Sequence, residues 1–261
     1  MPDAVINPGK DPAPKTGATI IAARPTRRYR AAAFQAYVLG ASAVFITLAV
    51  VAHTVAYFPI DLTITHVVQS YHGAFFDRLM YGVSWVGFMP QVDVLLVVAV
   101  ASLFMAGLRW ESAAALFAGC AFGIGMVVKL AVYRPRPSAD LVHVFSQLPS
   151  SGFPSGHVLE FTAFCGFLFF LTYTLLKPSW GRTSLLAASA LFILLMGLSR
   201  IYQGQHWFSD VMGAYLLGSL WLALTIKLYR WGKPRFFTHQ PVAPETAVAP
   251  VAPGAPASTG T

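Results

Sequence analysis

The chain has 261 residues, of which 56% are hydrophobic and only 11% are charged, and its mean hydropathy is +0.60. A soluble domain carries roughly 25% charged residues, so this composition excludes an ordinary water-soluble protein and indicates a membrane protein. The formal net charge of +8 comes from basic residues scattered between apolar runs. This scatter argues against nucleic acid as a partner and favours anionic membrane lipids.

The two ends of the chain are predicted to be disordered cytoplasmic tails. Residues 1–30 are polar, rich in proline and end in a basic cluster, and residues 233–261 are rich in Pro and Ala without periodicity. The first apolar run is too long for a signal peptide, whose apolar stretch has ~7 to 15 residues. We therefore expect this run to stay as a span, and a single transmembrane domain over residues 31–232.

Six apolar runs predict an all-α polytopic membrane protein, a bundle of six transmembrane helices. They fall at about 34–57, 91–108, 112–133, 157–176, 183–200 and 207–229. The second run has an alternative start near Leu79, with a kink at Pro90. Between the first two runs, a short interfacial helix is predicted by an apolar stripe opposite Asp61 and Thr65; the stripe consists of Ile60, Ile64, Val67, Val68 and Tyr71.

The distribution of Lys and Arg predicts the orientation in the membrane. With the N-terminus in the cytoplasm, 13 of the 18 basic residues fall on the cytoplasmic side and 5 on the other side. We therefore expect a cell-membrane protein with both termini in the cytoplasm. Four of the five exceptions lie at the extracytoplasmic ends of the expected helices, namely Lys129, Arg134, Arg136 and Arg200.

These basic residues predict an anion site at the outer ends of the helices. Cations near hydrocarbon are costly, so their convergence implies a bound anion, for which phosphate is the natural candidate. Ser155 and Gly156 stand at an expected helix N-terminus, where free N–H groups and the helix dipole also favour an anion.

Two histidines stand beside this expected anion site. His206 and Asp210 are four residues apart, so on one helix the carboxylate can hold an imidazole N–H and leave the other nitrogen free to attack. His157, on the opposite side, can protonate a leaving alkoxide. This arrangement predicts phosphoryl transfer through a phosphohistidine without a cofactor, because the fixed cations disfavour a divalent metal ion at these three side chains.

Three motifs in this order resemble the signature of the type-2 phosphatidic-acid phosphatase superfamily, in its membrane branch. They are Lys129, six residues, Arg136-Pro137; then Pro154-Ser155-Gly156-His157; then Ser199-Arg200, five residues, His206, three residues, Asp210. The motifs cover residues 129–210, and the six-helix layout extends the resemblance to about residues 30–232.

The resemblance implies a metal-independent lipid phosphatase and a role for each motif residue. By this resemblance, phosphate oxygens are bound by Lys129, Arg136 and Arg200, the site is completed by Ser155 and Gly156, His157 is the general acid, His206 is the nucleophile, and Asp210 orients it.

Two residues depart from the bare motifs. Arg134-Pro135 repeats Arg136-Pro137 two residues earlier, and Arg134 is expected to reach a second phosphate or only the lipid headgroups. Glu160 lies one turn after His157. It is expected either to raise the pKa of His157 or to interact with the positive end of the helix dipole. The remaining aromatic candidates are expected in loops, at the interface or in packing: His53, His66, His72, His143, His239, Phe161, Phe164, Phe167 and Phe170.

The sequence therefore predicts an enzyme that removes phosphate from a lipid phosphate monoester or diphosphate resembling phosphatidic acid. The alternatives within this chemistry are an undecaprenyl-diphosphate phosphatase, for which Arg134 is a weak indication, and a lipid phosphotransferase. A non-catalytic binder or transporter would need the cations but not His157, His206 and Asp210. Membrane lipids and the lipid phosphate are the expected partners, and the sequence specifies no oligomeric state.

Overall fold

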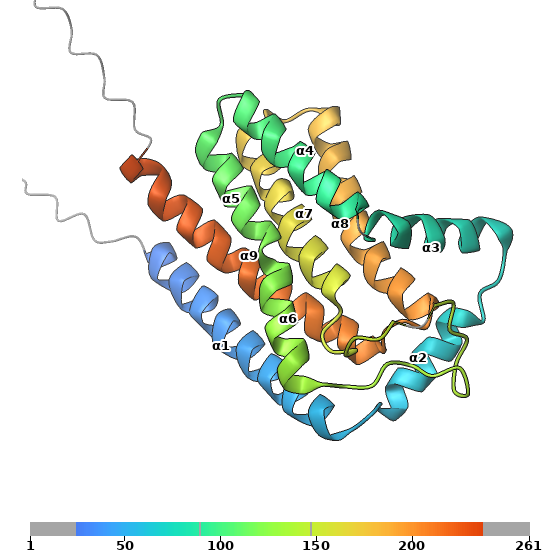
Figure 1. The fold of residues 1–261 in the computed structure, drawn as a ribbon. Coiled ribbons are helices and arrows are strands. Elements are labelled where there is room, and N and C mark those ends of the chain that lie inside the picture. Colours follow the sequence, from blue (N-terminus) through green and yellow to red (C-terminus); the bar gives the residue numbers. More distant parts are fainter. Residues whose placement is uncertain (1–24, 89, 147, 237–261) are drawn as a thin grey trace, which may run out of the picture. The chain divides into compact units, whose positions relative to one another are not determined.

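A computed structural model describes residues 25–88, 90–146 and 148–236. All regular secondary structure in these ranges is helical, which confirms the predicted all-α fold (Figure 1). The helices are α1 (Pro25–Thr54), α2 (Pro59–Gln69), α3 (Ala74–Val86), α4 (Gln91–Met105), α5 (Arg109–Gly119), α6 (Ala121–Val132), α7 (Gly156–Leu175), α8 (Trp180–Tyr202) and α9 (Phe208–Phe236).

The expected tails lie mostly outside the described residues, which begin at Pro25 and end at Phe236. Helix α1 starts inside the expected N-terminal tail, and α9 continues past residue 232. The chain up to Gly40 forms a contact unit of its own. The description that follows concerns the second unit, from Ala41 onward.

In the described part of the chain, five helical segments are long and apolar enough to span a membrane, and α3 with α4 forms a sixth candidate bent by 61°. These segments correspond to the six predicted runs. The alternative early start of the second run is close to the observed start of α3 at Ala74, and the bend falls between Val86 and Gln91. Helices α5 and α6 form one candidate span, Arg109–Val132, interrupted at Cys120.

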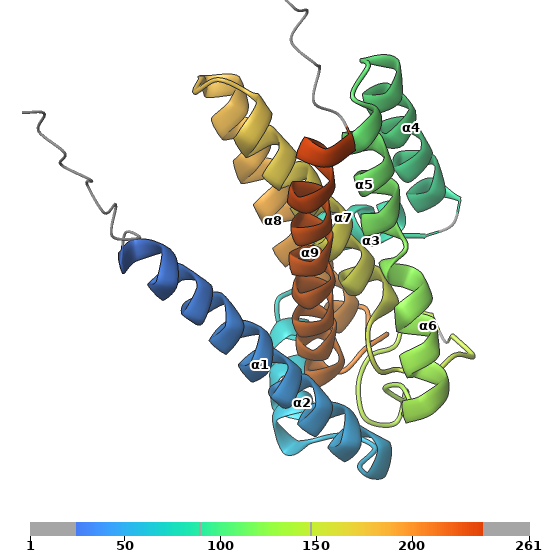
Figure 2. The ribbon, with the colours of Figure 1, turned by 90° about the vertical axis from the view of Figure 1, so that its left-hand side faces the viewer.

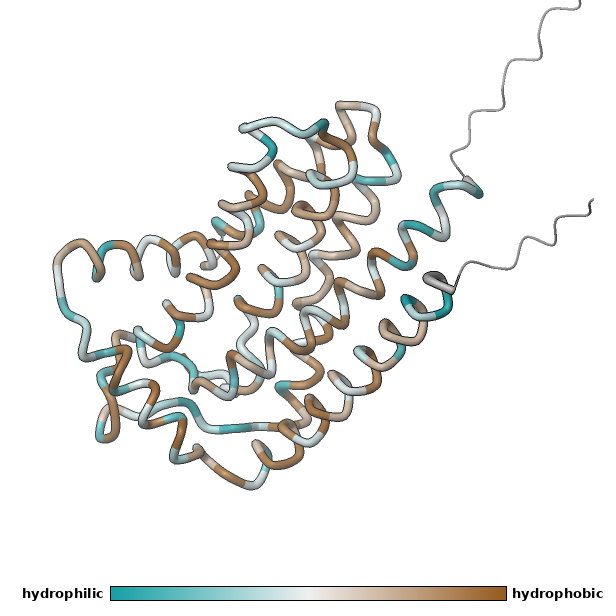
Figure 3. Tube along the Cα trace, turned by 180° about the vertical axis from the view of Figure 1, so that it is seen from behind, coloured by the Kyte–Doolittle hydropathy of each residue, from teal (hydrophilic) through white to brown (hydrophobic). Residues whose placement is uncertain are grey.

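The outer faces of these helices are apolar. Leu130 is 78% exposed, and Val97 and Leu194 are each 64% exposed. Figure 3 shows hydrophobic residues along the helices and hydrophilic stretches in several of the connections. Exposed apolar side chains are favourable in contact with the hydrocarbon of a bilayer. Helices can lie there because they satisfy their own backbone hydrogen bonds.

Helix α7 is the central helix of this unit and packs against α5, α6, α8 and α9. Its side chains Phe161, Phe164 and Phe167 are buried, which confirms their predicted packing role. A Cβ at Gly218 of α9 would lie 2.9 Å from the carbonyl oxygen of Leu159, so the close approach of these two helices requires glycine there. Figure 2 shows α9 running alongside α7.

The C-terminal ends of α6 and α8 and the N-terminal ends of α7 and α9 lie at the same end of the bundle, as predicted (Figure 1). The segment from residue 133 to residue 155 joins α6 to α7 across this end, and its described residues form no helix. The end of α1 is attached there too, because a ring nitrogen of His53 lies 3.0 Å from the Val132 carbonyl and Phe45 stacks on Phe153.

Helix α2 confirms the predicted short helix, but its polar face is turned inward. Asp61 and Thr65 are fully buried, whereas Ile60 and Val67 are more than half exposed. Helix α2 packs on α8 and α9. A helix on a membrane surface would turn its polar face to water, and α2 does not because Asp61 has a cationic partner inside the protein.

Candidate active site

Two of the predicted phosphate-binding cations lie near helix ends. Lys129, in the last turn of α6, is buried, and its Nζ donates to the Ser151 carbonyl at 2.7 Å. Arg200, in the last turn of α8, is fully buried. Its Nη1 donates to the Ser84 hydroxyl, and its guanidinium lies over the Phe88 ring at 5.1 Å from the centroid.

The third cation, Arg136, lies in the loop between α6 and α7. Its Nε and Nη2 donate to the carbonyl and the hydroxyl of Ser150, at 2.7 and 2.9 Å. Its Nη1 donates to the Gln205 carbonyl at 2.6 Å and lies 3.1 Å from Nε2 of His206. Arg136 therefore faces the nitrogen that sequence analysis predicts to be the nucleophile.

The N-terminus of α7 is built as an anion site requires. Ser155 is the N-cap residue and Gly156 the first helical residue. A Cβ at Gly156 would lie 3.8 Å from Cε of Lys129, so this helix end is close to a cation. Within the described residues, the buried Oγ of Ser155 and the buried Nε and Nη2 of Arg200 have no protein hydrogen-bond partner. Buried polar groups normally have partners, and phosphate oxygens are suitable ones.

His206 is oriented by a backbone carbonyl, which corrects the predicted bond to Asp210. Its Nδ1 lies 2.8 Å from the Gly152 oxygen, whereas Oδ2 of Asp210 is 3.7 Å away. The reason is that α9 begins at Phe208, so His206 precedes the helix that carries Asp210. With Nδ1–H donating to Gly152, the lone pair of Nε2 faces Arg136.

The environment of His206 keeps its imidazole neutral. Burial lowers the pKa of His206 well below its ordinary value, and the positive charges of Arg136, Lys129 and Arg200 lower it further, with a smaller effect of His157. The structure therefore brings the predicted cations and both predicted histidines into electrostatic reach of one another.

His157 stands in the first turn of α7, against the bend between α3 and α4. A Cβ at Gly87 would lie 2.6 Å from Cδ2 of His157, and the Phe88 ring packs edge-on at 5.5 Å. Glu160, one turn later, lines a groove with Asp93 of α4. The expected action of Glu160 on His157 stays a prediction.

Arg134 does not reach a second phosphate or the headgroup region, contrary to expectation. Its side chain is fully buried, and Nη1 donates to the Ser209 hydroxyl and to Oδ1 of Asp210 at 2.7 and 2.6 Å. Nη2 donates to Asp61 at 3.0 Å and Nε to the Ala56 carbonyl at 3.1 Å. Four donors are thus used inside the protein, because two buried carboxylates need a cation between them.

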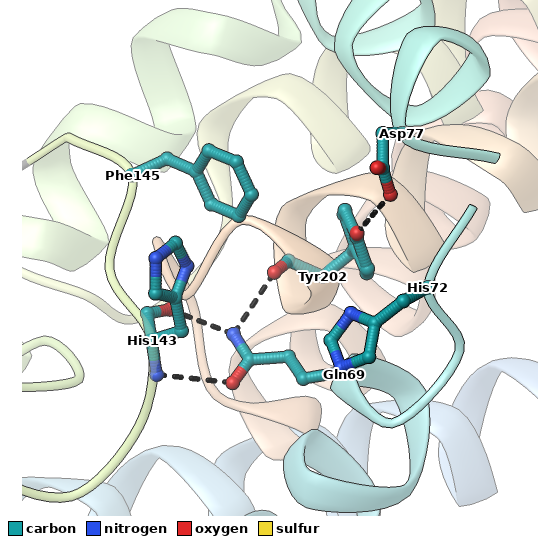
Figure 4. A pocket seen from close by; sticks show the side chains of 6 residues that line it. All are labelled: Gln69, His72, Asp77, His143, Phe145 and Tyr202. Atoms are coloured by element: carbon teal, nitrogen blue, oxygen red, sulfur yellow. Dashed lines mark hydrogen bonds between the residues drawn. The ribbon is translucent and has the colours of Figure 1, made fainter. Parts of the chain in front are cut away.

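A second pocket lies beside this end of the bundle, where α2, α3, α8 and the loop before α7 meet (Figure 4). The Tyr202 hydroxyl donates to Asp77 at 2.5 Å. The Gln69 amide bonds the backbone N–H and carbonyl of His143 and the Tyr202 carbonyl. His72 and His143 lie in connecting segments, as predicted, and the pocket contains no residue of the three motifs.

Sequence reasoning missed several residues that hold the site. Gly152 acts through its carbonyl, and Ser150 and Ser84 bond the cations, so no charge or spacing marks them. Asp61 and Ser209 carried a usable signal, because Asp61 is the one acidic residue of α2 and Ser209 directly precedes a motif residue.

Comparison with known proteins agrees with this geometry. The PAP2 superfamily matches residues 94–234. Phosphatidylglycerophosphatase B of Bacillus subtilis (strain 168) is 29% identical over 184 residues, which are 67% of this chain and 86% of that protein. Sphingosine-1-phosphate phosphatase 2 of Homo sapiens is 32% identical over 109 residues, 39% of this chain and 26% of that protein.

Two solved structures share the fold. The transmembrane PAP2-type phosphatidylglycerolphosphate phosphatase from Bacillus subtilis has a TM-score of 0.66 and 25% identity, covering 77% of this chain and 99% of that one. Aquifex aeolicus LpxE has a TM-score of 0.51 and 20% identity, covering 65% of this chain and 96% of that one. With a family match over more than half of its length, and with the motif residues gathered at one end of the bundle, this chain belongs to the PAP2 superfamily.

Proposed function

We propose that this membrane protein hydrolyses the phosphate monoester of a lipid such as phosphatidylglycerophosphate or phosphatidic acid, through a phosphohistidine at His206. The Bacillus subtilis relative, named a phosphatidylglycerophosphatase and aligned over 86% of its length, supports this substrate class. Membership of the PAP2 superfamily supports the reaction class.

In the first step, Nε2 of His206 attacks phosphorus. The N–P bond forms as the bond from phosphorus to the lipid oxygen breaks, and protonated His157 gives its proton to that oxygen. Lys129, Arg136 and Arg200 bind the phosphoryl oxygens and stabilise the charge on them in the transition state. Nδ1 keeps its proton, which the Gly152 carbonyl accepts.

In the second step, neutral His157 takes a proton from water, whose oxygen attacks the phosphorus. The P–N bond breaks, orthophosphate forms, and His206 regains its neutral imidazole. The orientation of His206 carries this proposal, because Nδ1 is fixed by Gly152 while Nε2 faces Arg136. A histidine that only joined two helices would not need its second nitrogen directed at a cation.

The arrangement of the cations favours a monoester over a lipid diphosphate. The four described hydrogen bonds of Arg134 all stay inside the protein, so its guanidinium is not free for a second phosphate. Lys129, Arg136 and Arg200 remain for one phosphoryl group. This distribution does not favour the undecaprenyl-diphosphate alternative.

We also propose that the site faces the extracytoplasmic side of the cell membrane, with both termini in the cytoplasm. The 13-to-5 division of basic residues supports this orientation. A tag at residue 1 should be inaccessible to antibody in intact cells. Labelling of that tag without permeabilisation would overturn the orientation.

The test of the function is phosphate release by the purified protein in EDTA, from phosphatidylglycerophosphate, phosphatidic acid and undecaprenyl diphosphate. We expect release from the monoesters to survive the chelator and to vanish in His206→Ala. In wild type, acid-labile phosphate should be trapped on the protein by rapid quenching. Unchanged turnover in His206→Ala would exclude His206 as the nucleophile, and faster release from the diphosphate would overturn the monoester preference.

A further inference from the structure

A chain of buried charges runs from the active site to α2. Oδ1 of Asp210 accepts from Arg134 at 2.6 Å, and the other terminal nitrogen of Arg134 donates to Oδ2 of Asp61 at 3.0 Å. All three side chains are fully buried. They come from α9, from the loop after α6 and from α2, and Asp61 lies outside residues 94–234, which the family matches.

Ser209 ties the two ends of this chain together. Its backbone N–H donates to Oδ1 of Asp61 at 2.7 Å, and its hydroxyl donates to Oδ2 of Asp61 at 2.8 Å while accepting from Arg134 at 2.7 Å. Because Ser209 directly precedes Asp210, Asp61 fixes the backbone of the first turn of α9. Together with the bond from Arg134 to Oδ1, this contact holds the side chain of Asp210 relative to His206.

The charges of this cluster do not cancel. Two carboxylates and one guanidinium leave a net charge of −1, whereas Arg134 and Asp210 alone would be neutral. Oδ2 of Asp210, the oxygen that Arg134 does not bond, lies 3.7 Å from Nδ1 of His206. The imidazole becomes positive when Nε2 bonds phosphorus, and a nearby negative charge stabilises that state.

A buried net charge is unfavourable in a contact whose only role is to join two helices. Burying a carboxylate costs several kcal/mol of desolvation, and replacing buried ion pairs by apolar side chains is often neutral or stabilising. The second buried carboxylate joins the start of α2 to the start of α9 through the N–H groups of Phe58 and Ser209, and it also adds a negative charge near His206, which three cations otherwise surround.

We propose that Asp61 is a positioning residue for phosphoryl transfer: through Arg134 and Ser209 it fixes Asp210, and it maintains a net negative charge beside His206. This inference rests on the proposed function, in which His206 is the nucleophile. Asp61 itself does not touch the substrate.

The variant Asp61→Asn tests the proposal, because it keeps the shape of the side chain and removes its charge, while replacing one of two oxygens that accept hydrogen bonds by an NH2 group. With phosphatidic acid in mixed micelles, kcat should fall on the order of 100-fold. KM should change little, because the three phosphate-binding cations are untouched.

The pH profile separates this role from a purely structural one. The charged and titratable groups around His206 are Arg136, Lys129, Arg200, His157 and Asp210, and all of them remain in the variant. Loss of the Asp61 charge makes His206 harder to protonate. The acid limb, which is the fall of kcat/KM at low pH as His206 becomes protonated, should therefore move to lower pH in Asp61→Asn.

Two further variants complete the experiment. Glu111→Gln removes another buried carboxylate, which bonds Tyr229 and Lys233 at the other end of α9, and should keep the wild-type kcat and acid limb. Ser209→Ala removes the bridging hydroxyl but no charge. Ser209→Ala should lower kcat about tenfold without moving the acid limb. If Asp61→Asn does not fold, Ser209→Ala tests whether this cluster positions Asp210.

The outcomes separate this inference from the proposed function, provided that folding is checked by size-exclusion chromatography and by inhibition with orthophosphate. Full turnover in His206→Ala would overturn the proposed function. Two results would overturn only the role of Asp61, provided that His206→Ala is inactive. In the first, folded Asp61→Asn keeps the wild-type kcat. In the second, it loses kcat but its acid limb does not shift. A wild-type kcat in Ser209→Ala would likewise contradict the positioning role.

Discussion

Helix α9 begins and ends at an ionic cluster, and the two clusters differ in burial and in charge. In its last turns, Lys233 bonds Glu111 of α5 at 2.5 Å, and the Tyr229 hydroxyl bonds the same carboxylate. This pair is neutral, and the Lys233 side chain is 42% exposed. In its first turn, Asp210 shares Arg134 with Asp61, with all three side chains fully buried and a net charge of −1.

If the proposed function holds, the difference separates an ion pair that attaches helices from a cluster that takes part in the reaction. A neutral pair that reaches the surface adds little to stability and can be exchanged for other contacts. A fully buried cluster with a net charge is costly unless opposite charge lies nearby. At the first turn of α9 the nearby positive charge is that of Lys129 and Arg136 and, in the proposed reaction, that of His206, whereas at the last turn the charge of Glu111 is paired with Lys233.

The largest effect is expected at Asp210, the carboxylate that lies 3.7 Å from His206. Asp210→Asn makes the cluster neutral and replaces an oxygen that accepts from the Trp207 N–H or from Arg134. We expect kcat for phosphate release to fall about 1000-fold, as in other sites where a carboxylate beside a catalytic histidine is made neutral. Stopped-assay measurement with phosphatidic acid checks this. A loss smaller than tenfold would show that Gly152 alone suffices to orient the imidazole.

A smaller effect is expected when a cation is kept but its shape is changed. Arg136→Lys retains the charge but cannot bond Ser150, Gln205 and a phosphate oxygen together. We expect kcat/KM to fall roughly 100-fold, since bonds from a guanidinium to an anion are strong and directional.

Arg182→Lys provides the matched control for this substitution. Like Arg136, Arg182 donates to a backbone carbonyl, that of Tyr173, but it lies at the start of α8, far along that helix from Arg200. Its replacement should leave kcat/KM within twofold of wild type. Equal losses in the two variants would mean that neither reports on the active site.

The pH dependence of the reaction should reflect the depressed pKa of His206. Burial and the neighbouring cations hold this pKa well below the ordinary value of about 6.5. His206 is therefore neutral at pH 7, and kcat/KM should begin to fall only well below pH ~6.5, by up to tenfold per unit. The free energy of unfolding should also decrease as the pH drops. The reason is that His206 has a higher pKa in the unfolded chain than in the folded protein, so the unfolded state binds the proton at a higher pH. An acid limb above pH 7 would contradict the assignment.

Much of this architecture could be predicted from the sequence, because each of its features is marked by residue type and spacing. Apolar runs predict the spans, and a cation such as Arg200 at the end of a run is unusual enough to mark a site. Ser155 and Gly156 are confirmed at the N-terminus of α7, since small residues and a following apolar run are typical of helix starts.

The rest depends on tertiary contacts that spacing does not encode. Gly152 orients His206 through a carbonyl, which every residue possesses. Arg134 and Arg136 look equivalent in the sequence, but buried partners far from Arg134 in the chain, Asp61 and Asp210, direct it inward while Arg136 faces His206. The start of α9 at Phe208 rather than before His206 likewise changes which group holds the imidazole.

The smallest effect is expected at the far end of α9. Glu111→Gln removes the charge that pairs with Lys233 but keeps a carbonyl oxygen for the Tyr229 hydroxyl. Because Lys233 is partly exposed and can turn to water, we expect a stability loss of about 1 kcal/mol and an unchanged kcat. Thermal unfolding in detergent and phosphate release measure the two quantities. A loss of activity as large as that of Asp210→Asn, with the stability unchanged, would mean that the two clusters are coupled along α9, and the division into an attaching end and a catalytic end would fail.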